Sequence, residues 1–353
     1  MRIKVKNRFI SEKDKPFLIA EISANHKNSI KKTFQLLNEA KRIGVDAVKF
    51  QTFDLNEMTL NIKKKEFLIK NKFKTKSWNN RSLYSIYKEA QLPFSWHKKI
   101  FDKAKKLGLI YFSSVFDEKS LKFLEKLNVP MYKVASLESL HFPLIKKICK
   151  TKKPIIISTG TLSMNEIEKL AKFLKKNNCK NYIILHCVTQ YPADYKNVNL
   201  ETIKILRKKF KCLIGYSDHT KGIGVALSSI NYGACVIEKH FILNSKDKTL
   251  DSNFSSNPDE MENLVNEIKN SWEAKGKPKL NISGGEKIYK NYRRSIYVTE
   301  NIKKNQKFTP KNIKVIRPGF GMEPKFYERV IGKISKKNLK IGDPLKMNMI
   351  KFN

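Results

Sequence analysis

The sequence has no long apolar run, few acidic residues and little cysteine. A membrane-spanning helix needs about 18 or more consecutive apolar residues, and no stretch of this kind occurs. The five cysteines are scattered and form no C-x-x-C pair, which argues against a disulfide framework or a zinc site. Cys187, Cys212 and Cys235 lie in apolar runs and are expected to be buried. The charged first residues are followed by no apolar segment of a secretory signal, so we expect a cytoplasmic protein.

Acidic residues are outnumbered by basic ones, 32 Asp and Glu against 72 Lys and Arg, which gives a formal net charge of +40. Such an excess is typical of proteins that bind nucleic acid, acidic membrane surfaces or anionic substrates. Here it is nearly all lysine, is spread over the whole length and accompanies abundant Ile and Asn, as an AT-rich genome would produce. A spread charge is not a binding footprint, so we expect neither nucleic acid nor a membrane as partner. A non-catalytic polyanion-binding protein is the alternative.

Short apolar runs alternate with amphipathic stretches through most of the chain, at 41% hydrophobic residues. Strands are predicted to begin at Phe17, Ala47, Leu109, Met131, Pro154, Tyr182, Cys212 and Cys235. Helices are predicted over 30–43, 94–107, 117–127, 142–150, from about 164, over 199–209, from Gly222 and over 258–274. Eight β/α units within about 270 residues predict an α/β fold of the TIM (β/α)8 barrel type. A doubly wound sheet would carry a Gly-rich turn after its first strand, and Ala20-Glu-Ile-Ser-Ala-Asn-His has none.

The composition changes after the last predicted helix, where Lys-Gly-Lys-Pro and Ser283-Gly-Gly-Glu follow. We therefore predict a barrel domain over 1–277, a linker over 278–294 and a small β-rich domain over 295–353. The last segment is too short to build a large core, and we expect it to dock against the barrel or a second subunit.

Polar residues lie at the end of nearly every predicted strand, where TIM barrels carry their active sites. Lys49 and Lys133 lie inside apolar strands, where an ammonium group is costly unless it meets a charge. With Ser136 and Ser158 they would bind a phosphate or carboxylate. The alternatives are lysines that extend to the surface and a Schiff-base aldolase.

His219 and His240 end adjacent strands, which lie about 4.8 Å apart in a sheet. Two imidazoles at that spacing suit a divalent metal with open positions for water or substrate, such as Mn²⁺ or Mg²⁺. Taken singly, each histidine is more often structural than a ligand.

These segments occur in an order that resembles the N-acetylneuraminate synthase family. The motifs are Ala20-Glu-Ile-Ser-Ala-Asn-His, Asp46-Ala-Val-Lys-Phe-Gln-Thr, Tyr132-Lys-Val-Ala-Ser, Ile157-Ser-Thr-Gly, Gly215-Tyr-Ser-Asp-His-Thr and Ile237-Glu-Lys-His-Phe. The tail with Arg317-Pro-Gly-Phe-Gly resembles the antifreeze-like (SAF) domain of that family. Within it, Ser-Ala-Asn-His after Glu21 and Leu83-Tyr-Ser-Ile-Tyr-Lys-Glu-Ala look most like pseudaminic acid synthases. N-acetylneuraminate and legionaminate synthases are the alternatives.

The resemblance implies a role for each candidate residue. Phosphoenolpyruvate would be bound by Lys49, Ser114, Lys133, Ser136, Ser158 and Ser217. The catalytic residues would be Glu21, Glu138, His219 and His240, and the two histidines would hold the metal. The sugar would be contacted by Gln51, Tyr191, Asp251 and Arg317. The family usually has Thr in place of Ser114, and its Gly-Pro-Asp is Thr-Leu-Asp at Asp251.

The resemblance also implies the reaction and the assembly. Phosphoenolpyruvate would condense with an N-acetylated amino sugar, expected to be a 2,4-diacetamido-2,4,6-trideoxy hexose, to give a nonulosonic acid and phosphate. No organic cofactor would be needed. The enzyme would be a homodimer in which each SAF tail is swapped onto the partner, so that Arg317 reaches the partner's barrel.

Overall fold

Parallel strands form a closed barrel in the order β10-β3-β4-β5-β6-β7-β8-β9. The computed structural model describes residues 1–70, 76–276, 278 and 280–352. The barrel strands are β3 Phe17–Glu21, β4 Ala47–Thr52, β5 Ile110–Val115, β6 Tyr132–Val134, β7 Ile155–Ser158, β8 Tyr182–Cys187, β9 Leu213–Asp218 and β10 Val236–His240. The predicted TIM barrel is therefore confirmed, with each strand at the position that the apolar runs indicated.

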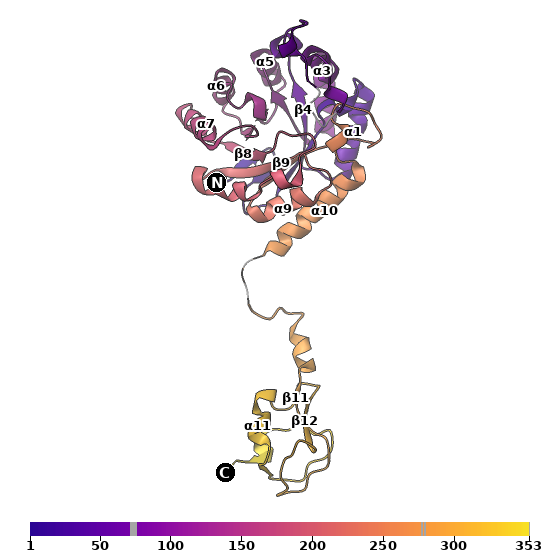
Figure 1. The fold of residues 1–353 in the computed structure, drawn as a ribbon, viewed down its shortest axis with the longest axis vertical. Coiled ribbons are helices and arrows are strands. Elements are labelled where there is room, and N and C mark those ends of the chain that lie inside the picture. Colours follow the sequence, from indigo (N-terminus) through magenta and orange to yellow (C-terminus); the bar gives the residue numbers. More distant parts are fainter. Residues whose placement is uncertain (71–75, 277, 279, 353) are drawn as a thin grey trace. The chain divides into compact units, whose positions relative to one another are not determined.

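Helices surround the barrel (Figure 1). They are α1 Ile30–Ile43, α2 Leu55–Met58, α3 Leu83–Ala90, α4 Phe94–Lys106, α5 Glu118–Lys126, α6 Phe142–Lys150, α7 Met164–Lys176, α8 Glu201–Phe210, α9 Gly224–Tyr232 and α10 Pro258–Lys275. Local sequence fixes several starts. Ser163 and Glu166 form a capping box on α7, and Asn257 and Glu260 form another on α10. Among the described residues, none of the helices combines the length and apolarity that crossing a bilayer demands.

A hairpin of β1 (Ile3–Val5) and β2 (Arg8–Ile10) precedes the barrel and was not predicted. Ile3, Val5 and Ile10 are buried against inward-facing residues near the starts of the barrel strands, such as Phe17 and Val236. The hairpin therefore closes the amino-terminal end of the barrel. The three-residue strands were too short to give a clear period in the sequence.

The chain divides into two compact units, Met1–Gly276 and Lys277–Asn353. The second unit is built from short antiparallel pairs, β11 (Ser295–Val298) with β12 (Ile313–Ile316) and β13 (Ile334–Ser335) with β14 (Ile350–Lys351). It also includes a short α-helix, α11 (Tyr327–Val330). Its small core contains Ile296, Phe308, Val330 and Leu345. The β-rich character predicted for the tail is confirmed.

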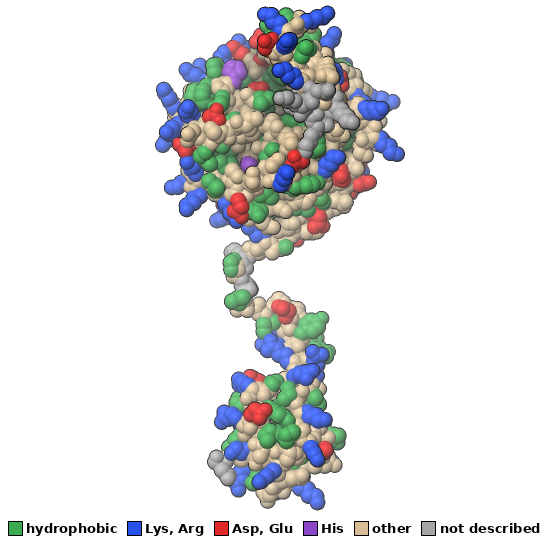
Figure 2. All heavy atoms as spheres, viewed as in Figure 1, with side chains coloured by type: hydrophobic (Ala, Val, Ile, Leu, Met, Phe, Trp, Pro, Cys, Tyr) green, Lys and Arg blue, Asp and Glu red, His purple; other side chains and the backbone are tan. Residues whose placement is uncertain are grey.

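The basic side chains do not gather at one place on the face of the larger unit seen in Figure 2. Lys and Arg lie around most of its edge, Asp and Glu lie at the lower right, and apolar and uncharged groups dominate the centre. Many lysines end a helix, for example Lys126 on α5 and Lys175 and Lys176 on α7, where a positive charge complements the helix dipole. All five cysteines are buried, which confirms the expectation for Cys187, Cys212 and Cys235.

Candidate active site

The carboxyl ends of the barrel strands bring together two lysines and two glutamates from four different strands. Lys49 Nζ contacts the carboxylate of Glu21 and lies 3.7 Å from Glu238 Oε2. Lys133 Nζ lies 3.4 Å from Glu238 Oε1. The side chains of Lys49 and Lys133 are each only 3% exposed, so the alternative that they extend to the surface is wrong. Two cations and two carboxylates therefore form a buried cluster at the carboxyl end of the barrel.

Serine hydroxyls complete this cluster. Lys49 Nζ donates to Ser114 Oγ at 3.0 Å, and Ser217 Oγ donates to Glu238 Oε1 at 3.1 Å. Gln51, two residues beyond Lys49 on β4, lines the adjacent cavity. Successive strand residues face opposite sides, so Lys49 and Gln51 share the inner face of β4. Ser114 thus gives Lys49 an uncharged partner, and Ser217 gives one to Glu238; an entering anion could share both hydroxyls.

Burial and neighbouring charges change the proton affinity of these groups. Burial raises the pKa of Glu21 to about 7, with Glu238 adding to the effect and Lys49 opposing it. Burial lowers the pKa of Lys133. Burial alone would raise the pKa of Glu238, but Lys133 and Lys49 outweigh it and hold that pKa below its ordinary value. Glu238 is therefore the lasting counter-ion of the lysines, and Glu21 is the carboxyl that exchanges a proton near neutral pH.

A second group of hydroxyls lies beside the lysines, after β6, β7 and β8. Ser136 begins the short helix Ser136–Glu138, and its Oγ accepts a hydrogen bond from Gly160 N at 3.1 Å. The hydroxyls of Ser158 and Thr189 are buried and have no hydrogen-bond partner within the described chain. A buried hydroxyl without a partner is costly. These hydroxyls are thus suited to a ligand with several acceptor oxygens.

Gly160 provides a sensitive test of this anion site. A Cβ at this position would lie 2.1 Å from Thr189 Oγ1 and 2.8 Å from Ser136 Oγ, so both hydroxyls would have to turn away. We expect Gly160→Ala to fold and to raise the KM for phosphoenolpyruvate, the anion that the family resemblance implies, at least about tenfold, the effect of one lost hydrogen bond to a charged group. Steady-state kinetics will measure it. Gly224→Ala is the matched control, because nothing lies within 4 Å of its added Cβ. An unchanged KM in Gly160→Ala would contradict the assignment.

His219 and His240 form the other half of the site. Their ring centroids are 5.5 Å apart. His219 Nδ1 lies 2.9 Å from Val188 O, which leaves its Nε2 for another partner. His240 Nδ1 is buried without a hydrogen-bond partner within the described chain. Burial, together with the neighbouring His219, lowers the pKa of His240 well below its ordinary value, so it is a neutral imidazole, the form that binds metals.

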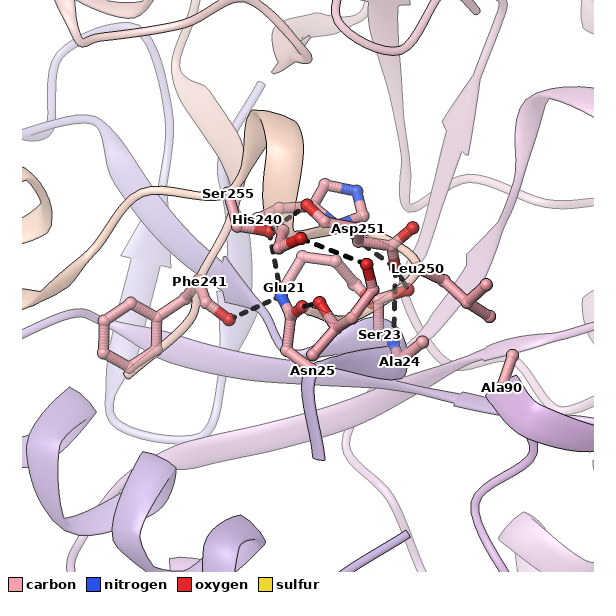
Figure 3. A network of polar contacts seen from close by, with 12 residues as sticks. Glu21, Ser23, Ala24, Asn25, Ala90, His240, Phe241, Leu250, Asp251 and Ser255 are labelled. Carbon is pink, nitrogen blue, oxygen red and sulfur yellow. Dashed lines mark hydrogen bonds and ion pairs between the residues drawn. The ribbon is translucent and has the colours of Figure 1, made fainter. Parts of the chain in front are cut away.

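Asp251 lies beside His240, with Oδ2 3.9 Å from His240 Nδ1 (Figure 3). The same oxygen accepts hydrogen bonds from Ser23 Oγ at 2.5 Å and Ala24 N at 3.3 Å. Within the described ranges, no three His, Cys, Asp or Glu residues are grouped closely enough to hold a metal by themselves. The donor set therefore fits a divalent ion only as an open site, in which water or substrate joins the two histidines.

A cavity of about 220 Å³ lies next to these groups. Its polar wall comprises Gln51, Ser136, Glu138, Tyr191, His240 and Asp251. Glu138 Oε2 is buried without a hydrogen-bond partner in the described part of the chain, and burial raises the pKa of Glu138 to about 7. Tyr191 packs against His219, with ring centroids 4.4 Å apart. The cavity therefore brings a proton-exchanging carboxyl close to the histidines.

The rest of the cavity lining is apolar and comes largely from the described residues between β4 and α4. It includes Met58, Ile69, Trp78, Leu83, Ile86 and Leu250. Trp78 Nε1 donates to Leu250 O at 3.0 Å, which fixes the indole ring over the cavity. The sequence analysis used Leu83-Tyr-Ser-Ile-Tyr-Lys-Glu-Ala from this region only as a point of resemblance, and the role of the region as a cavity wall was not predicted.

Most of the candidate residues come together here, and Arg317 belongs to the second unit, where it is exposed. The sequence placed Glu238 and Thr189 among the polar residues at or just after the strand ends, but it assigned neither of them an individual role. Glu238 carried a signal for the inner face, because residues two apart on a strand share a face and His240 was already placed. Nothing local indicated the position of the Thr189 hydroxyl, since Thr189 lies beyond the end of β8.

The cluster of Lys49, Lys133, Glu21 and Glu238 and the paired histidines lie at the carboxyl end of a closed barrel, where TIM-barrel enzymes carry their active sites. The family model NeuB matches residues 36–279, and the SAF domain matches residues 293–351. The chain belongs to the NeuB family, which confirms the predicted resemblance.

Similar proteins agree with this family. The chain is 37% identical over 334 residues to the pseudaminic acid synthase of Campylobacter jejuni, covering 94% of this chain and 96% of that protein. It is 38% identical over 332 residues to the pseudaminic acid synthase of Helicobacter pylori, with the same coverage. The crystal structure of N-acetylneuraminic acid synthetase from Leptospira borgpetersenii superposes with a TM-score of 0.71 at 27% identity, over 82% of this chain and 94% of that one. These relatives are enzymes, which favours a synthase over the non-catalytic alternative.

Proposed function

We propose that this enzyme condenses phosphoenolpyruvate with a 2,4-diacetamido-2,4,6-trideoxy hexose and releases phosphate and a nonulosonic acid of the pseudaminic acid type. The observation that carries the proposal is the buried pair Lys49 and Lys133 next to His219 and His240 in one barrel mouth. Similarity to pseudaminic acid synthases over 94% of the chain supports the choice of product. We also propose a cytoplasmic location, where phosphoenolpyruvate is available.

The lysine half of the site would bind phosphoenolpyruvate. Lys49 and Lys133 would pair with its phosphate and carboxylate, and Ser114, Ser136, Ser158 and Ser217 would donate hydrogen bonds. As C3 of phosphoenolpyruvate attacks the aldehyde carbon of the sugar, positive character develops at C2. Water adds at C2, and phosphate then leaves by cleavage of the C–O bond. Fixed charges that do not have to reorganise during these steps lower the barrier.

The histidine half would activate the sugar. A divalent ion such as Mn²⁺ or Mg²⁺, held by His219 and His240, would act as a Lewis acid on the aldehyde oxygen. Glu138 would take the proton of the attacking water, because it is buried, unpaired at Oε2 and close to neutral in its pKa. Asp251 and Gln51 would hold sugar hydroxyl or acetamido groups. When phosphoenolpyruvate binds Lys49 and displaces the Glu21 carboxylate, that carboxylate would take up a proton.

The apolar wall supports a deoxy acceptor. Trp78, Ile69 and Ile86 offer no hydrogen bond from their apolar surfaces, and they match the C6 methyl and the acetamido methyl groups of such a sugar. An apolar pocket rejects an added hydroxyl by about a hundredfold at most. We therefore expect kcat/KM for the trideoxy sugar to exceed that for N-acetylmannosamine by about ten- to a hundredfold.

Phosphate release from phosphoenolpyruvate, measured with a panel of hexosamine-derived sugars and with mass spectrometry of the products, tests the proposal. A nine-carbon diacetamido acid is the expected product. No phosphate release with any amino sugar would overturn the proposed function, and preferred use of N-acetylmannosamine would reassign the acceptor.

We predict that removing divalent metal abolishes turnover. Two strand-end histidines leave positions for a substrate oxygen, and the two lysines of the site, Lys49 and Lys133, are paired with carboxylates and so are not available to polarise the aldehyde. Dialysis against a chelator should lower kcat at least about a thousandfold, and Mn²⁺ or Mg²⁺ should restore it. Full activity at a metal content below the enzyme concentration would contradict the prediction.

We predict that kcat/KM rises with pH through about 7, where it is half-maximal, and levels off roughly one pH unit above that. Burial raises the pKa of Glu138 from 4.5 to about 7, and the residue must be ionised to accept a proton. Glu138→Gln should lose this acid limb together with most of its activity. A limb that persists in Glu138→Gln would belong to Glu21, whose pKa is also about 7, and a profile flat between about pH 6 and 8 would contradict both.

The titration of Glu138 affects folding stability in the opposite direction to activity as pH rises. A carboxyl whose pKa is higher in the folded than in the unfolded chain binds more protons when folded, so stability falls as pH rises from 4.5 to about 7. Thermal unfolding at pH 6 and at pH 8 is therefore the control: it should show that lower activity at pH 6 is not caused by lower stability.

A further inference from the structure

Behind the two histidines lies a second ion pair, between Asp218 and Lys239, which the proposed reaction does not use. Lys239 Nζ lies 2.7 Å from Asp218 Oδ2, and both side chains are 0% exposed. The two residues are direct partners in the pairing of β9 with β10. Each stands one position before a histidine, Asp218 before His219 and Lys239 before His240.

The pair lies on the face of these strands that is turned away from the site. Ser217 Oγ bonds to Glu238 on the inner face, where the lysine cluster is. Successive strand residues point to opposite faces, so Asp218 and Lys239 point outward. They therefore contact neither the cavity nor the buried cluster of lysines and glutamates directly.

Further hydrogen bonds connect the pair to the backbone around His219. Asp218 Oδ1 accepts from Thr220 N at 2.9 Å, from Thr220 Oγ1 at 2.7 Å and from Tyr216 OH at 3.2 Å. Lys239 Nζ donates to Thr220 O at 2.9 Å. The residues on both sides of His219 are thus bound to one network, and Lys239 links that network to the strand of His240.

Stability does not account for this arrangement. Burying two charges costs desolvation free energy, and replacing a buried pair by apolar residues is often neutral or stabilising. The ion pair fixes how β9 and β10 lie relative to each other at the strand ends that carry His219 and His240. An apolar pair would pack there without the directional contacts of an ion pair.

We propose that Asp218 and Lys239 are positioning residues that set the separation and orientation of the His219 and His240 imidazoles, and through them the sugar-activating half of the site. This inference rests on the proposed function for its kinetic consequence and on the geometry alone for its structural one. It predicts that the two halves of the site respond differently to loss of the pair.

The test is the charge-neutral double variant Asp218→Asn/Lys239→Met. The amide oxygen of the substituted side chain can still accept from Thr220, so the turn is kept while the link between strands is lost. We expect the imidazole ¹H–¹⁵N signals of His219 and His240 to shift in the metal-free protein. Mn²⁺ affinity and kcat should each fall about ten- to a hundredfold, as when residues supporting metal ligands are altered. The KM for phosphoenolpyruvate should stay within about threefold, since Lys49 and Lys133 are on other strands.

The matched control is Arg8→Met/Asp46→Asn, which removes an ion pair at the opposite end of the barrel. There Arg8 Nε lies 2.8 Å from Asp46 Oδ1, and Asp46 Oδ2 accepts from Leu18 N. This control should lower the unfolding temperature and leave the imidazole signals and kcat unchanged. If the Asp218/Lys239 variant behaves like it, the pair is merely structural and the proposal is overturned.

Thr220→Val keeps both charges and removes only the hydroxyl that bonds to Asp218, so it decides the question if the double variant does not fold. Shifted His219 signals with an unchanged KM for phosphoenolpyruvate support the proposal, and parent-like signals overturn it. If the parent protein releases no phosphate with any sugar, the proposed function fails. The imidazole comparison, which needs neither substrate nor metal, still decides the positioning role.

Discussion

Replacing Lys49 by methionine will weaken phosphoenolpyruvate binding about ten- to a hundredfold or more while leaving the KM for the sugar within about threefold. The reason is that Lys49 is almost fully buried and would form a charge-assisted contact with the anion, worth roughly 1.5–3 kcal/mol. Titration calorimetry with phosphoenolpyruvate will give the affinity directly. Lys133→Met should behave in the same way, since Lys133 is equally buried.

Loss of Lys49 also leaves Glu21 and Glu238 as neighbouring carboxyls without their shared cation, so the single variant should be less stable. Lys49→Met/Glu21→Gln removes that conflict and should regain stability without regaining phosphoenolpyruvate affinity. Lys153→Met is the control for a lost lysine, because Lys153 Nζ donates to Val129 O, away from the site. Parent-like affinity in a folded Lys49→Met protein would mean that the lysine serves the fold alone.

Arg317→Ala will be nearly inactive on its own and will regain activity when mixed with His219→Ala. This expectation rests on the homodimer that the family resemblance implies, in which each SAF domain would complete the partner's barrel. Arg317 is exposed on the second unit, so its substitution should not disturb that unit's core of Ile296, Phe308 and Leu345. In the mixture, one site in each mixed dimer would combine an intact barrel with an intact tail.

The size of the recovery is set by symmetry. Equal amounts of the two chains give about half mixed dimers, and one of the two sites in each is intact, so activity should reach roughly a quarter of the parent's. Native mass spectrometry can verify subunit exchange. No recovery after exchange would mean that Arg317 acts within its own subunit or not at all. If Arg317→Ala were as active as the parent protein, Arg317 would not belong to the site.

The barrel could be predicted because its strands are continuous apolar runs such as Pro154-Ile-Ile-Ile-Ser, and its helices carry amphipathic periods and caps. Strand ends could be located to within a residue or two, and TIM-barrel geometry then placed Lys49, Lys133, His219 and His240 at one end. The hairpin at the amino-terminal end could not be predicted, because Ile3–Val5 and Arg8–Ile10 are too short to show a period.

The residue types of the site were predictable, but their partners were not. The sequence indicated lysines for an anion, yet it gave no sign that Glu21 and Glu238 neutralise them, because that contact joins β3, β4, β6 and β10. The apolar wall depends likewise on how Trp78 folds back to Leu250, 172 positions away in the sequence. Such long-range contacts follow from tertiary packing and have no local pattern.

The hairpin that closes the amino-terminal end has a kinetic consequence. With that end filled by Ile3, Val5 and Ile10, the substrates of the proposed reaction would enter, and its products would leave, through the carboxyl end. Lys49 and Lys133 are almost fully buried and do not line the cavity that would hold the sugar. A sugar bound first would thus obstruct the route to the lysines. Under the proposed function we therefore expect phosphoenolpyruvate to bind before the sugar, and excess sugar to act as a substrate inhibitor that phosphoenolpyruvate relieves.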